Sequence, residues 1–140
     1  MDNRRRDNGL ATPVEMMYLL MFCLVAVVFL GFVGRLHAAG VQVTNAAQAA
    51  ARAASLEPDP AAANRSAATV VASSALRERC VGNARMSLSW SPSPSGTWRG
   101  GAVTVVVACT VQNRSLTGVW APGTYTVVMT DTQPVDRYRR

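Results

Sequence analysis

Residues 16–34 form a continuous apolar run of 19 positions without a charged side chain. As a helix with a rise of ~1.5 Å per residue, the run is about 28 Å long, close to the ~30 Å hydrocarbon core of a bilayer. It therefore predicts a transmembrane helix. A cleaved signal peptide ending at the small residues 38–40 is one alternative, although signal peptides have apolar regions of only ~7–15 residues. A buried helix of a soluble protein is another, but the rest of the chain is small for covering it on all sides.

The alanine-rich residues 41–56 continue the helical pattern. Apolar side chains recur at helical spacing on one face, at Val43, Ala46, Ala47, Ala50 and Ala54. The opposite face is polar, with Asn45, Gln48, Arg52 and Ser55. Because neither glycine nor proline interrupts this stretch, we expect it to extend the transmembrane helix as one long stalk. The shallow alanine face suits packing on the chain's own domain and packing on another subunit equally well.

A second helix is expected at residues 61–79, after a turn at residues 57–60 in which two prolines end the first helix. Its apolar stripe is expected at Ala68, Val71, Ala72, Ala75 and Leu76. The short connection makes the two helices antiparallel neighbours.

Three later segments alternate with the period of two that is typical of half-buried strands. Their expected inward positions are Met86, Leu88 and Trp90, then Val103, Val105, Val107, Cys109 and Val111, then Tyr125, Val127 and Met129. Loops at residues 91–101 and 113–123 separate them. The predicted fold class is therefore α+β, with a long N-terminal transmembrane and stalk helix, a second helix, and a small three-stranded antiparallel sheet. One face of the sheet is expected to lie on the second helix.

The arginines around the apolar run predict its orientation in a membrane. Arg4, Arg5 and Arg6 precede it, and Arg35 is the one arginine close behind it. This bias places the N-terminus in the cytoplasm and the C-terminal domain outside. The three leading arginines can also contact anionic headgroups. We expect a cytoplasmic leader at 1–12, a transmembrane and stalk helix at 13–56, an extracytoplasmic head at 57–131 and a C-terminal tail at 132–140.

Two of the three cysteines are expected to form a disulfide. Cys80 follows the second helix, and Cys109 shares a strand face with the core valines. Outside the cytoplasm such a pair is oxidised, although two free buried thiols are the alternative. Cys23 lies in the apolar run and is expected to act as a small hydrophobic residue.

Residues 9–15 read GLATPVE and are followed by the apolar helix and the alanine- and arginine-rich residues 43–54. This arrangement resembles the TadE-like family, minor pilins or pseudopilins of the tight-adherence (Flp) pilus system, and residues 132–139 resemble the ending of actinobacterial members. The resemblance implies a pilin-like fold and a leader that is cut at a small residue, five positions before a glutamate. A cut after Gly9 makes Glu15 the sixth residue of the mature chain, and a cut after Leu10 makes it the fifth.

Glu15 stands at the cytoplasmic edge of the apolar run, just after Pro13. An interfacial glutamate that favours the positive end of the helix dipole would account for one acid here. The family resemblance implies a second role, in which the carboxylate pairs with the N-terminal amine of a neighbouring subunit. An unpaired carboxylate near hydrocarbon is costly, so such a neighbour would hold the two subunits in register.

The sequence shows no constellation of catalytic residues, and we expect neither an enzyme nor a cofactor. His37 is the one histidine and adjoins Arg35 at the membrane edge, where an interfacial role is favoured over base catalysis. Two thiols and a distant histidine give weak grounds for a metal site. The net charge of +6 is spread along the chain, which argues against nucleic acid as a partner.

Three functions are compatible with these patterns. The favoured one is a minor pilin or pilus-assembly component in the cell membrane, structural and not catalytic, whose partners are membrane lipid and other pilin subunits that contact its transmembrane helix. A membrane-anchored extracytoplasmic binding module unrelated to pili is the second, and a soluble factor released near Gly40 is the third. No small-molecule substrate is expected in the favoured case.

Overall fold

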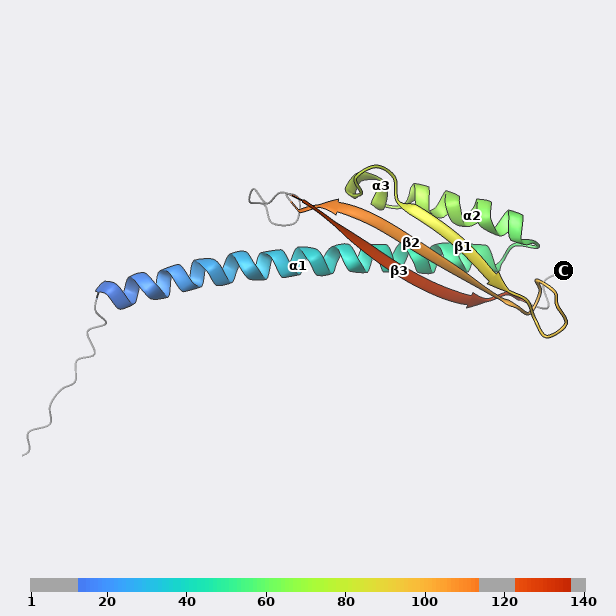
Figure 1. Cartoon of the computed structure of the whole chain (residues 1–140), viewed down its shortest axis with the longest axis horizontal. Helices are drawn as coiled ribbons and strands as arrows, with labels where there is room; N and C mark the ends of the chain where they lie inside the picture. The colour runs from blue at the N-terminus through green and yellow to red at the C-terminus, as the bar shows by residue number, and fades with distance from the viewer. Residues whose placement is uncertain (1–12, 114–122, 137–140) are drawn as a thin grey trace, which may run out of the picture.

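The computed structural model describes residues 13–113 and 123–136. The described elements are α1 (Pro13–Ser55), α2 (Pro60–Ser73), α3 (Leu76–Arg79), β1 (Arg85–Ser91), β2 (Ala102–Gln112) and β3 (Thr124–Pro134). Figure 1 shows α1 as a long rod, with the other elements gathered along its C-terminal half. We call this C-terminal half of α1, together with α2, α3 and the sheet, the head. The expected α+β fold is confirmed.

Helix α1 is a single helix of 43 residues, as the uninterrupted pattern predicts. At ~1.5 Å per residue it is about 64 Å long, roughly twice the hydrocarbon thickness of a bilayer. Pro13 begins it, where the fixed φ of proline suits the first turn, and Glu15 lies in that turn. The helix therefore combines an exposed apolar N-terminal half with a C-terminal half that belongs to the head.

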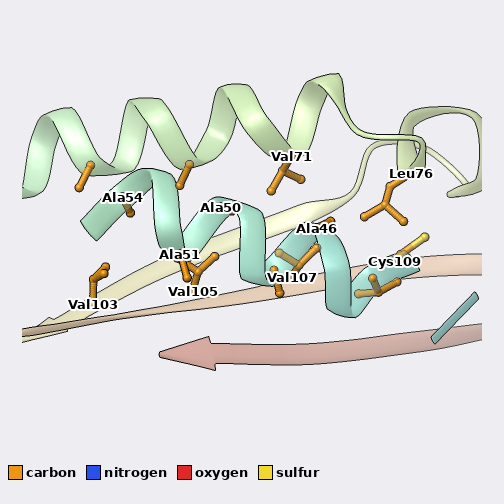
Figure 2. Packing of buried hydrophobic residues seen from close by; sticks show 14 of the residues in the cluster. Ala46, Ala50, Ala51, Ala54, Val71, Leu76, Val103, Val105, Val107 and Cys109 are labelled. Carbon is orange, nitrogen blue, oxygen red and sulfur yellow. The ribbon is translucent and has the colours of Figure 1, made fainter. Parts of the chain in front are cut away.

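The C-terminal half of α1 lies between α2 and the sheet, so it is the central layer of the head (Figure 2). The five expected face positions are all buried: Val43, Ala46, Ala47, Ala50 and Ala54. Ala51, which the stripe did not include, is fully buried as well. Packing of the alanine face on the chain's own domain, one of the two alternatives, is thus what the structure shows. Alanine side chains allow the neighbouring layers to approach α1 closely on two sides.

The sheet does not lie on the second helix, as the sequence led us to expect. Strands β2 and β3 pack on α1, and α2 reaches the sheet at β1 (Figure 1). Helix α1 is buried on two sides. Helix α2 packs on one of these sides, and the sheet packs on the other. The alternation of apolar residues predicts that a sheet has a buried face but does not identify the helix that covers it.

The expected helix at residues 61–79 is two helices, α2 and α3. Asp59 caps α2 by accepting a hydrogen bond of 2.8 Å from the amide of Ala62, and Pro60 takes the first position. Helix α2 ends at Ser73, and the next residue, Ser74, caps it. The Ser74 hydroxyl donates to the carbonyl of Val71 at 2.6 Å and accepts from the amide of Leu76 at 3.4 Å. Such local side-chain bonds compete with the helical ladder.

The expected stripe of this region is partly wrong. Val71 and Leu76 are buried, but Ala68, Ala72 and Ala75 are exposed. The positions of α2 that pack against α1 are Ala63, Ala67 and Val71, spaced four residues apart. Alanines occur on all sides of α2, so its sequence offers little contrast for choosing the buried face.

The sheet is an antiparallel meander in the order β1-β2-β3. The expected inward residues of β2 are all buried: Val103, Val105, Val107, Cys109 and Val111. In the outer strands Val127 is buried and Met86, Leu88 and Met129 are half-buried, whereas Trp90 and Tyr125 are exposed. The difference follows from position, because a central strand has neighbours on both sides and the ends of outer strands do not.

Strand β3 continues to Pro134, three residues beyond the expected boundary between head and tail. Val135 is buried and joins the β1–β2 loop through two backbone hydrogen bonds, from its amide to Gly101 at 2.9 Å and from Gly100 to its carbonyl at 3.1 Å. Gly101 fits there because a Cβ would collide with the backbone oxygen of Ser91. Residues 132–135 are therefore part of the head.

Candidate membrane segment and the base of the head

The N-terminal half of α1 has no covering from the described part of the chain. The consecutive residues 16–22 are all exposed, and since 3.6 residues make one turn they face every direction around the helix. Met17, Tyr18 and Phe22 are each more than 70% exposed. A core helix of a soluble protein would bury such side chains, so this segment needs cover from outside the described chain.

By length and composition, α1 is the one helix of the described residues that could cross a membrane. Its most apolar 18-residue window has a mean hydropathy of 2.7, and none of that window is buried. This combination separates it from the buried core helix that was one alternative. The apolar half is followed directly by Arg35, where the charged residues resume.

Glu15 is exposed in the first turn of α1, at the end farthest from the head (Figure 1). Nearly the whole apolar run separates its carboxylate from the head, so no part of the head lies beside it. The first turn of a helix carries unpaired backbone amides, which favour an acidic side chain at this place. The arginines Arg4, Arg5 and Arg6 and the candidate cleavage residues Gly9 and Leu10 lie outside the described residues.

The expected disulfide between Cys80 and Cys109 is present. It connects the residue after α3 to the inward face of β2, and the amide of Val81 also donates to the carbonyl of Thr110. Short α3 is thereby held to the sheet at the end of the head nearest the apolar half of α1 (Figure 1). Cys23 is exposed in the apolar half, away from this bond.

A pocket of about 380 Å³ opens at this same end, which we call the base of the head. Helix α1 contributes Arg35, Ala39 and Gln42 to its lining, and α3 contributes Glu78 and Arg79. The inner wall is apolar and includes the disulfide residue Cys109. We call this cavity the basal pocket.

Gln42 carries an unusual polar atom at the basal pocket. Its Oε1 is buried and has no hydrogen-bond partner, the one such side-chain atom in the part of the chain that the structure describes. A buried acceptor without a donor costs about 1–3 kcal/mol. Nothing in the sequence singles out Gln42. Arg35, Glu78 and Arg79 line one pocket with it only because α3 packs beside α1.

A metal site and His37 are the remaining candidates from the sequence. Within 13–113 and 123–136 there is no group of three or more His, Cys, Asp or Glu side chains placed to hold a metal ion. His37 lies in a shallow groove between α1 and β3, beside Gly40, Tyr125 and Met129. The groove is lined mainly by apolar atoms and holds no second titratable side chain except the tyrosine.

Comparison of the chain with protein-family models, with curated proteins and with solved structures finds no match in any of the three.

Proposed function

We propose that this chain is a single-pass membrane protein that serves as a minor pilin or assembly component of a tight-adherence pilus, with its N-terminus in the cytoplasm and its head outside. The supporting observation is the division of α1. One helix is uncovered and apolar in its N-terminal half and is the central layer of a small α+β head in its C-terminal half. This layout suits a subunit that associates through its membrane helix and presents its head to partners.

The role is structural in this proposal. Subunits would meet along the apolar half of α1, where van der Waals contacts and buried polar groups drive association of helices in a bilayer. Glu15, in the first turn, is the polar group best placed to select a partner, because a carboxylate at the edge of hydrocarbon gains from a cationic neighbour. The N-terminal amine of an adjacent subunit after leader removal is such a group.

A membrane-anchored binding module unrelated to pili is the second candidate. The exposed apolar half of α1 supports this candidate too. A helix that only anchors the protein does not need a particular sequence around Glu15. The two candidates therefore differ in whether the N-terminal region can be replaced.

The intact mass and N-terminal sequence of the native protein, purified from membranes, test the proposal. A mature start at Leu10 or Ala11 is the expected result and would agree with pilin-type processing. An intact Met1 in a membrane-bound protein would favour the binding module. A mature start at Val41 would contradict membrane anchoring, because the entire apolar half of α1 would then be absent.

A further inference from the structure

We propose that the basal pocket binds the headgroup of an anionic phospholipid in the leaflet next to the head. In this arrangement Arg35 and Arg79 contact the phosphate. The inference rests on the membrane anchoring of the proposed function and extends it, since it assigns the base of the head a ligand.

The basal pocket opens just above the apolar run of α1. The apolar run ends at Gly34, so Arg35 marks the edge of the hydrocarbon layer. The headgroup layer on each side of a bilayer is about 5–8 Å thick, and the four residues from Arg35 to Ala39 rise about 6 Å. The mouth of the pocket therefore lies at the level of the phosphates.

The lining of the basal pocket carries two positive charges. Arg35 and Arg79 line the pocket from two different elements, α1 and α3, and both are exposed. Arginine presents a planar fork of donors that suits phosphate oxygens, and guanidinium groups on two sides can hold one phosphate between them. Glu78 also lines the pocket, so its carboxylate reduces the positive charge that the phosphate meets.

Phosphatidylglycerol matches the two cationic side chains because its headgroup carries a net negative charge, whereas the choline of phosphatidylcholine offsets the charge of its phosphate.

The experiment uses the full chain in neutral detergent micelles, titrated with phosphatidylglycerol and followed by native mass spectrometry. Before the titration, the chain is floated with phosphatidylcholine vesicles as a control that tests membrane anchoring. Arg35→Gln and Arg79→Gln are each expected to weaken phosphatidylglycerol binding roughly fivefold. Glu78→Gln is expected to tighten it, because it removes the negative charge from the pocket.

Arg65→Gln is the matched control, since Arg65 is an exposed arginine of α2 that does not line the basal pocket. Equal weakening by Arg65→Gln would overturn the inference in favour of general charge attraction. Full competition by inorganic phosphate would overturn the assignment to a lipid. Failure of the chain to float with vesicles would contradict membrane anchoring itself, whereas normal flotation with unchanged lipid binding in Arg35→Gln and Arg79→Gln would contradict only the basal pocket.

Discussion

The indole Nε1 of Trp98 donates a hydrogen bond of 2.9 Å to the backbone carbonyl of Glu57, 41 positions earlier in the sequence. Trp98 belongs to the loop between β1 and β2, and Glu57 to the turn between α1 and α2. The bond therefore ties the sheet to the helices at the end of the head opposite the basal pocket. Trp98 is buried, and its ring contacts that of Trp90 edge to face at a centroid distance of 5.5 Å.

Trp98→Phe is expected to destabilise the head by about 1–2 kcal/mol. The substitution removes this hydrogen bond and leaves the partly buried carbonyl of Glu57 without the indole donor. Circular dichroism during urea unfolding of the full chain in detergent micelles would measure the loss. Trp90→Phe is the matched control, with a smaller expected loss since Trp90 is 41% exposed. Equal losses in both variants would show that ring packing matters more than the hydrogen bond.

Removal of the disulfide is expected to reduce stability by about 3–4 kcal/mol, the chain-entropy value for a bond that closes a loop of this size. The bond spans 29 positions from Cys80 to Cys109. The measurement compares thermal unfolding of the native protein with and without reductant. In the Cys80→Ala/Cys109→Ala variant the reductant should have no effect. An unchanged midpoint on reduction of the native protein would contradict the prediction.

Ala51→Leu is expected to destabilise the head by about 1–3 kcal/mol, since the larger side chain has no room in the central layer. Ala51 is fully buried (Figure 2). Ala49→Leu, at an exposed position of the same helix, is the control and should change stability by less than about 0.5 kcal/mol. Urea unfolding of both variants would test the difference. A similar small effect at both positions would mean that the sheet and α2 do not pack tightly on α1.

Glu15→Gln is expected to weaken co-purification with partner pilin subunits roughly tenfold while insertion into membranes stays normal, because the amide retains size but loses the charge that a cationic neighbour would pair. Quantitative pull-down from solubilised membranes would measure it. Glu57→Gln, in the turn between α1 and α2, is the control for loss of a carboxylate elsewhere. Unchanged co-purification of Glu15→Gln would count against an assembly role for this residue.

Much of the head could be predicted from local pattern. Alternation along β2 identified every inward residue from Val103 to Val111, because a central strand with one buried face repeats at two residues. The continuous helix through Gly34 and Gly40 was also predictable, since no proline interrupts it after Pro13. The pairing of Cys80 with Cys109 followed from the strand face and the expected location outside the cytoplasm.

The errors arose where alanine is abundant. Helix α2 has alanines on every side, so its sequence could not distinguish the buried Ala63 and Ala67 from the exposed Ala68 and Ala72. The break at Ser74 was missed as well, because a serine at a helix end resembles a serine within a helix until its hydroxyl finds a backbone partner.

The sequence by itself determined the elements whose signal is local: the apolar run with its length, the long helix, the three alternating strands and the cysteine pair. Tertiary structure alone decided which helix covers the sheet and which residues meet at the base of the head. Arg35, Gln42 and Arg79 share a pocket because α3 packs beside α1, with Cys80 bonded to β2. Periodicity records which side of an element avoids water, whereas the choice of neighbour depends on the fit of surfaces that are distant in sequence.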